Sequence, residues 1–196
     1  MHKVLIPLAH DCMEAGGRAK QEARAEGCEE LEAVTIIDLL RRAEITVVSA
    51  GLDTNPVTAS RGTVLIPDTD LDTALQDDYD MVVLPGGLPG ADHLANDDRI
   101  KNILIKMANS EKFTAAICAA PKVLANAGIL DGKKATSYPG FLKPENNTEI
   151  SNDAVVIDGK VITSRGPGTA MDFALTLIES LEGKEKRDEV EKGLVR

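Results

Sequence analysis

The sequence is poor in aromatic residues and carries a strongly one-sided charge. Its 196 residues include no Trp, two Tyr and three Phe, so the core must consist mainly of Val, Ile, Leu and Ala. The formal net charge is −10. A protein that binds a phosphate backbone needs a basic surface, so we expect no specific binding of nucleic acid.

Signals for disulfides, metals, nucleotides and membranes are also missing. No two of the three cysteines have CxxC spacing, and the odd number leaves at least one thiol free. The chain lacks the GxxxxGK[ST] and GxGxxG nucleotide motifs, and its first apolar run, VLIPLA, is too short for a signal peptide or a membrane span. The histidines, none of which has a metal-ligand spacing, are His2, His10 and His93. We expect a cytoplasmic protein without a metal or cofactor.

What the sequence does contain is an alternation of short β-branched runs with longer amphipathic stretches. Strands are expected at 3–9, 45–51, 80–87, 113–118 and 134–138. Helices are expected at 29–43, 97–112, 166–183 and 184–195. Two hairpins are expected, at 57–67 and 154–164. The alternation predicts a single α/β domain with a mostly parallel sheet covered on both faces.

Ligands of such a sheet bind beyond the carboxyl ends of its strands. The turns there follow residues 9, 84, 118 and 163, and they can converge on one site. Cys118 lies in the third turn, between the run TAAI and a helix beginning AAPKVL. The start of a helix favours the thiolate, which makes Cys118 a candidate nucleophile. A small buried cysteine of the core fits the same position, so position alone leaves both interpretations open.

Two other turns contain groups that suit such a nucleophile. Gly86 and Gly87 permit close approach of the backbone and an N–H aimed at an oxyanion, although a tight turn alone needs the same residues. Acidic residues at 29, 30 and 32 open a helix, where they complement its dipole. Glu32 is expected to rotate toward the sheet. Burial there would raise its pKa and leave it a proton to donate to a thiolate.

Several segments together resemble the DJ-1 family of the DJ-1/PfpI superfamily. They follow the family order over nearly the whole chain: GCEELEAVTIIDLLRRA, ASRGTVLIPD, YDMVVLPGGLPGA, AAICAAP and TSRGPGTAMDFALTLIE. The resemblance implies a flavodoxin-like three-layer sandwich, one domain over residues 1–196, and a homodimer.

The resemblance also implies a site. Cys118 matches the reactive cysteine on the nucleophile elbow, and Glu32 matches the glutamate that hydrogen-bonds it in protonated form. Gly87 and Ala119 match the positions whose backbone N–H groups form the oxyanion pocket. The other residues implied to line the site are Gly86, Arg61, Arg165, Gly166, Pro167 and, from a dimer partner, Arg42.

Two features depart from the family pattern. Many members have a histidine close to the cysteine where this chain has Tyr138, which leaves acid–base work largely to Glu32. Residues 10–25 look inserted. We expect a solvated excursion there. The alternatives are a lid, or a thiol at Cys12 that pairs with Cys28 or resolves an oxidised Cys118.

The resemblance implies cofactor-independent glyoxalase or deglycase chemistry on small α-oxoaldehydes, such as methylglyoxal and glyoxal, or on their adducts. The alternative is a redox-sensing, chaperone-like protein of oxidative stress in which Cys118 is oxidised to a sulfinate. A peptidase of the superfamily would need a histidine directly after the nucleophile, and the next residue is Ala119. A peptidase is therefore not expected.

Overall fold

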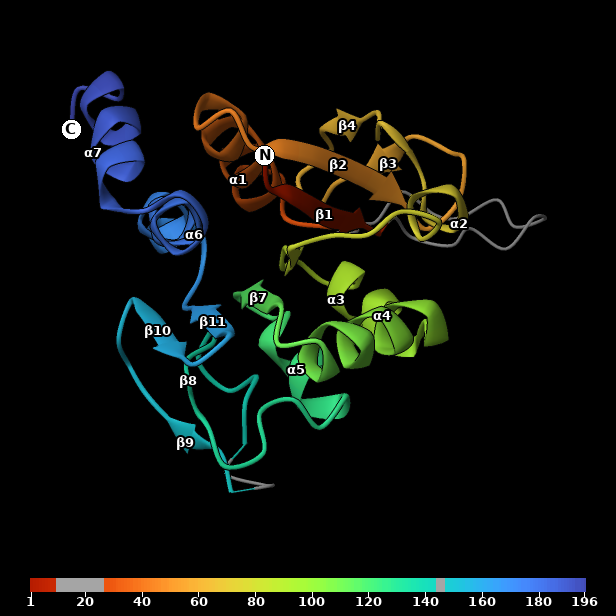
Figure 1. Ribbon diagram of the computed structural model, residues 1–196. Helices are drawn as coiled ribbons and strands as arrows, with labels where there is room; N and C mark the ends of the chain where they lie inside the picture. The colour runs from red at the N-terminus through yellow and green to blue at the C-terminus, as the bar shows by residue number, and fades with distance from the viewer. Residues whose placement is uncertain (10–26, 144–146) are drawn as a thin grey trace.

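A computed structural model describes residues 1–9, 27–143 and 147–196 of the chain (Figure 1). A seven-stranded sheet forms its centre, in the order β10-β11-β7-β6-β1-β2-β5. All neighbouring strands are parallel except the β10–β11 pair. The strands are β1 (Lys3–Leu8), β2 (Thr46–Gly51), β5 (Thr69–Asp70), β6 (Met81–Leu84), β7 (Phe113–Ile117), β10 (Val155–Asp158) and β11 (Val161–Ser164).

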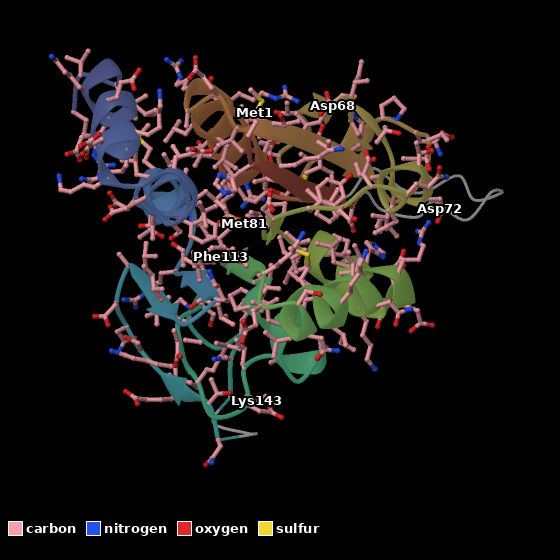
Figure 2. All side chains as sticks on the ribbon, in the orientation of Figure 1. Met1, Asp68, Asp72, Met81, Phe113 and Lys143 are labelled. Atoms are coloured by element: carbon pink, nitrogen blue, oxygen red, sulfur yellow. The ribbon has the colours of Figure 1, made fainter. Side chains whose placement is uncertain are left out.

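Helices cover both faces of this sheet. On one side lie α1 (Glu30–Arg42), α6 (Ala170–Glu182), which follows the short 3-10 helix η1 (Pro167–Thr169), and α7 (Lys184–Gly193) (Figure 1). On the other lie α2 (Leu71–Ala74), α3 (Gly90–Asn96), α4 (Asp98–Asn109) and α5 (Pro121–Asn126). Side chains fill the spaces between the layers, with Met81 among them (Figure 2). The expected α/β sandwich with a mostly parallel sheet is confirmed.

Helix α1 turns Glu32 toward the sheet. Glu29 caps the helix, because its carboxylate accepts the backbone N–H of Glu32 at 2.8 Å. Ala33, Ile36 and Leu40 form the buried face, at helical spacing. Glu32 shares that face and is fully buried. The sequence-based expectation for its direction is confirmed.

Both predicted hairpins are present. In the first, β3 (Val57–Thr58) pairs antiparallel with β4 (Val64–Leu65). In the second, β10 pairs with β11 around a turn in which Gly159 has a φ of 61°, a conformation that favours glycine.

The strand expected at 134–138 is wrong in both extent and place. Only β8 (Lys134–Ala135) is extended, and it pairs with β9 (Glu149–Ile150) in a separate two-stranded sheet. Beyond it, the backbone N–H of Thr136 donates to the side chain of Thr163, and that of Tyr138 donates to the carbonyl of Cys118. The first N–H thus binds a side chain of β11 and the second binds at the Cys118 turn, so neither belongs to a backbone ladder of the main sheet.

Two further expectations are not tested by the described residues. The predicted insertion at 10–25, with His10 and Cys12, lies outside the described residues, and the division into one domain stays a prediction. Within the described ranges, no helix has both the length and the apolar character needed to cross a bilayer. In the same ranges, no group of three His, Cys, Asp or Glu side chains is placed to hold a metal ion.

Candidate active site

Cys118 occupies a strained turn between β7 and α5. Its φ of 64° lies in the left-handed region, which non-glycine residues seldom adopt. Two hydrogen bonds hold this conformation: its N–H donates to the carbonyl of Ser164 at 3.0 Å, and its carbonyl accepts the N–H of Tyr138 at 2.8 Å. The turn presents the side chain, which belongs to a residue only 9% exposed, beyond the end of the strand.

Glu32 reaches this side chain from α1. One carboxyl oxygen, Oε2, accepts the backbone N–H of Gly86 at 2.8 Å, and the side chain also hydrogen-bonds Cys118. The other oxygen, Oε1, is buried and has no nitrogen or oxygen partner among the described residues. An unpaired buried oxygen disfavours the charged carboxylate, so the arrangement favours a proton on Glu32.

Glycine at positions 86 and 87 allows the start of α1, the turn after β6 and the turn at Cys118 to pack in direct contact. A Cβ on Gly86 would lie 2.6 Å from the Cβ of Cys118 and 2.7 Å from Oε2 of Glu32. Gly87 has a φ of 94°, and a Cβ there would lie 2.4 Å from the backbone nitrogen of Glu29. The same nitrogen donates to the carbonyl of Gly86 at 2.8 Å. The start of α1 therefore packs directly on this turn, which brings Glu32 to Cys118.

The electrostatics of the pair differ from the sequence-based expectation for Cys118. Burial raises the pKa of Glu32 from 4.5 to about 7, against the opposing hydrogen bond from Gly86. Burial and the neighbouring Glu32 carboxylate raise the pKa of Cys118 to about 12, although backbone N–H groups of Gly87 and Ala119 favour the thiolate. The backbone N–H groups at this position favour the thiolate, as expected, but burial outweighs them. The thiolate depends on Glu32 holding a proton.

Loop 164–169 borders Cys118 through its backbone. Ser164 supplies the carbonyl that accepts the Cys118 N–H, and the loop is tied together by the hydroxyl of Thr169. That hydroxyl lies 3.1 Å from the nitrogen of Gly166, whose N–H it accepts, and 2.7 Å from the hydroxyl of Ser164. Pro167 begins η1 within this loop. The structure thus joins the start of this loop to Cys118, and the predicted lining of the site by Arg165, Gly166 and Pro167 stays a prediction.

The three predicted arginines have partners other than the reactive pair. The Arg61 guanidinium donates to the carbonyl of Ser60, and that of Arg165 donates to the carbonyl of Asn152. Among the described residues, neither group hydrogen-bonds Cys118 or Glu32. Asn152 belongs to the segment between β9 and β10, so the Arg165 guanidinium is engaged by that segment and not by the reactive pair.

Arg42 is the last residue of α1, ten residues after Glu32, or about 15 Å along the helix axis. Its guanidinium pairs with Asp38 at 2.9 Å. Within its own chain it therefore lies one helix length from the carboxyl of Glu32. The predicted role of Arg42 at the site of a partner stays a prediction.

Sequence reasoning missed Phe141. It lies in the same loop as Tyr138, and the two rings meet edge to face, with centroids 6.0 Å apart and an interplanar angle of 77°. Tyr138 is 48% exposed. Two aromatic residues three positions apart, in a chain with so few, were the signal that could have found this pair.

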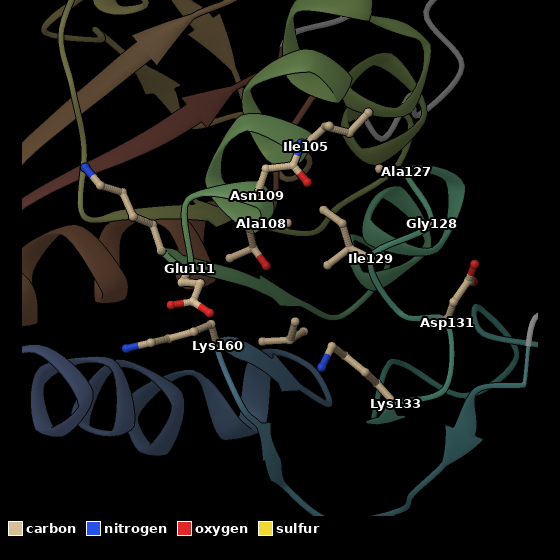
Figure 3. Close-up of a pocket in the computed structure, with 13 residues that line it drawn as sticks. Ile105, Ala108, Asn109, Glu111, Ala127, Gly128, Ile129, Asp131, Lys133 and Lys160 are labelled. Atoms are coloured by element: carbon tan, nitrogen blue, oxygen red, sulfur yellow. The ribbon is translucent and has the colours of Figure 1, made fainter.

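A cavity of about 440 Å³ lies apart from this site (Figure 3). It is lined by residues near the start of β7, such as Thr114, and by Ile129, Lys133 and Lys160. Cys118 follows the opposite end of β7. The lining contains neither Cys118 nor Glu32.

Comparisons with known proteins show the family of the chain and agree with its fold. The DJ-1/PfpI family model matches residues 23–180. Protein dj-1beta of Drosophila melanogaster is 46% identical over 175 residues, which are 87% of this chain and 93% of that protein. Its crystal structure superposes with a TM-score of 0.86 at 42% identity, covering 99% of this chain and 97% of that one.

Two further proteins are similar. The glutathione-independent glyoxalase DJR-1.2 of Caenorhabditis elegans is 38% identical over 170 residues, which are 86% of this chain and 91% of that protein. The structure of oxidized Toxoplasma gondii DJ-1 has a TM-score of 0.86 at 36% identity, covering 100% of this chain and 98% of that one.

Proposed function

Because the chain belongs to the DJ-1/PfpI family, we propose that it is a cofactor-independent glyoxalase that acts on small α-oxoaldehydes or their adducts. The observation that carries the proposal is the buried pair of Cys118 and Glu32, joined by a hydrogen bond and flanked by the N–H groups of Gly87 and Ala119. A relative that is named a glutathione-independent glyoxalase supports it.

The first step is addition of sulfur to the aldehyde. In the one-proton state of the pair, the Glu32 carboxylate takes the proton of the Cys118 thiol while the sulfur bonds to the aldehyde carbon. The electron pair of the carbonyl moves onto oxygen, where the N–H groups of Gly87 and Ala119 stabilise the negative charge. Glu32 then gives its proton to this oxygen, which leaves a neutral hemithioacetal and a carboxylate.

The second step moves a hydrogen between adjacent carbons. The Glu32 carboxylate takes the hydrogen of the former aldehyde carbon as a proton, and returns it to the neighbouring carbon by way of an enediol. The first carbon is thereby oxidised to a thioester and the second is reduced to an alcohol, so no external oxidant is needed. Water then hydrolyses the thioester, which releases a 2-hydroxy acid and restores the thiol.

The test is conversion of methylglyoxal into lactate by the purified chain. We expect turnover by the wild type, loss in Cys118→Ala, and retention in Cys28→Ala, which removes another buried thiol. If the wild type forms lactate no faster than Cys118→Ala does, the proposed function is wrong.

A second candidate function rests on the same sulfur. Two N–H groups and a protonated carboxyl would donate hydrogen bonds to the oxygens of a sulfinate at Cys118. Each of two peroxide molecules would transfer one oxygen to the sulfur and leave as water. Intact mass after mild peroxide tests this: two oxygens gained in the wild type but not in Cys118→Ala would support a sensor, and indiscriminate oxidation would contradict it.

We also propose a homodimer, as the family resemblance implies. Leu31 and Val34 on α1 and Val64 on β4 are between 47% and 59% exposed, and a second copy would cover them. It would also bring its own Arg42 from the far end of α1. The measurement is molar mass in solution: Val34→Asp is expected to give a monomer, whereas Ile157→Asp, on β10, leaves the mass unchanged.

A further inference from the structure

The few aromatic residues of the chain are unevenly placed. Tyr79 and Phe173 are buried in the core, and Phe113 is half-buried at the start of β7. The other two, Tyr138 and Phe141, share the loop that follows β8. Of the five, only Tyr138 is exposed. A single exposed aromatic ring is ordinary on a protein surface, so its position must carry the argument.

That position is beside the reactive cysteine. The backbone N–H of Tyr138 donates to the carbonyl of Cys118 at 2.8 Å. The ring lies against Gly166, where an added Cβ would come within 3.3 Å of the ring carbon Cδ2. Gly166 in turn follows Ser164 and Arg165, and Ser164 accepts the Cys118 N–H. The ring is therefore attached to both backbone segments that hold the nucleophile in its turn.

Phe141 also braces the ring. Phe141 meets it edge to face, and the backbone N–H of Phe141 donates to the carbonyl of Tyr138 at 3.1 Å. The ammonium of Lys122 lies 5.5 Å from the centroid of the Phe141 ring and pairs with Asp92. Lys122 is four residues beyond Cys118. The brace thus connects two further elements near the site, α5 and α3, to the aromatic pair.

A ring held in this way can accept a second ring with little further loss of conformational freedom. Aromatic pairs gain energy beyond the area that they bury, in stacked or edge-to-face contact. A methyl group in the same place would gain only the burial of its own surface. Glycine at 166 also keeps the space beside the Tyr138 ring free of a side chain.

We propose that Tyr138, braced by Phe141, is a specificity-determining residue, and that the site prefers α-oxoaldehydes with a planar aromatic substituent over those with a methyl group. The inference rests on the proposed function for its substrate, but its second test below does not. We expect kcat/KM to be higher for phenylglyoxal than for methylglyoxal.

The first test compares these ratios between variants. Tyr138→Leu keeps an apolar side chain but removes the ring, and we expect the ratio to fall about 2- to 10-fold, the range of one aromatic pair. Tyr138→Phe restores the ring and should restore the ratio, which also separates the ring from its hydroxyl. Phe113→Leu is the matched control. Its ring lies 3.9 Å from the ammonium of Lys160, at the other end of β7, so the ratio should not change.

The second test needs no aldehyde turnover. Phenacyl bromide and bromoacetone each alkylate a thiol: the sulfur–carbon bond forms, the carbon–bromine bond breaks, bromide leaves with the electron pair and buffer takes the thiol proton. The ratio of the two rates at Cys118, divided by the same ratio for glutathione, isolates the contribution of the site. We expect this corrected ratio to favour phenacyl bromide by about 2- to 10-fold in the wild type, and we expect no preference in Tyr138→Leu.

The outcomes separate the two proposals. A preference in alkylation without turnover of either aldehyde overturns the glyoxalase proposal and leaves the aromatic preference standing. Turnover of both aldehydes with ratios that Tyr138→Leu does not change overturns the aromatic preference and leaves the glyoxalase. A corrected alkylation ratio near one in the wild type also overturns the preference, whatever the enzyme turns over.

Discussion

Replacing Glu32 by Gln should stabilise the protein, by an amount that grows with pH. The folded chain raises the pKa of Glu32 from 4.5 to about 7, because the carboxyl is buried. Between these pH values the folded state holds more protons than the unfolded state, so the stability of the wild type falls as pH rises. Gln has the same shape and no charge to bury. The pKa difference corresponds to about 3 kcal/mol in the free energy of unfolding above pH 7, by which the Gln variant should exceed the wild type.

Urea unfolding of both proteins between pH 5 and pH 8 measures this difference. We expect Glu32→Gln to be more stable by about 1 kcal/mol at pH 5 and about 3 kcal/mol at pH 8. At pH 8 the melting temperature should rise by roughly 6 to 12 °C. Glu30→Gln is the matched control on the same turn of α1. Hydrogen bonds from its own backbone N–H and from those of Thr63 and Arg61 outweigh its small burial and lower the pKa of Glu30, so its loss should destabilise the fold at pH 8.

Two results would refute the reasoning. One is a Gln variant that is less stable than the wild type at pH 8. The other is a difference in stability that does not change between pH 5 and pH 8. Either would mean that Glu32 is hydrated in solution, and the proton that the proposed mechanism assigns to it would be lost as well.

Three other predictions follow from the same geometry. Gly86→Ala would press a methyl group onto Cys118 and should cost about 1–3 kcal/mol of stability along with turnover, whereas Gly168→Ala, which meets open space among the described residues, should unfold like the wild type. The kcat/KM for methylglyoxal should rise with pH through about 7, as the pair of Glu32 and Cys118 passes from two protons to one, and a profile flat from pH 6 to 8 would contradict the shared proton. Thr169→Val removes the hydroxyl that ties loop 164–169 together, and denaturant unfolding should show a loss of about 1–3 kcal/mol.

The local sequence pattern was enough to predict most strands of the sheet and the direction of Glu32, one of the two residues of the reactive pair. The β-branched runs that became β1, β2, β6 and β7 are short, apolar and separated by helical stretches. Helical spacing from Ile36 and Leu40 is enough to place Glu32 on the buried face of α1. Its raised pKa then follows from burial, which depends on no distant residue in detail.

What sequence could not supply depends on contacts between distant segments. The left-handed conformation of Cys118 is held by Ser164 and Tyr138, which no local rule connects to it. The strand predicted at 134–138 is misplaced for the same reason, since its backbone N–H groups bind the side chain of Thr163 on β11 and the carbonyl of Cys118. The pKa of Cys118 could not be foreseen either, because the helix start favours the thiolate while tertiary burial opposes it more strongly.

The bond between Ala9 and Cys28 has a consequence for how this chain can change in length. The N–H of Cys28 donates to the carbonyl of Ala9 at 3.0 Å, and the N–H of Gly90 donates to the carbonyl of Gly27 at 3.3 Å. The point where the chain leaves β1 and the point where it enters α1 are thus clamped together. Lengthening a loop whose two ends are held together costs only about 0.6 kcal/mol of loop-closure free energy for each doubling of its length. A change in the length of the chain between Ala9 and Gly27 can therefore leave the start of α1, and with it Glu32, in place, which makes this a natural point to graft a new recognition element.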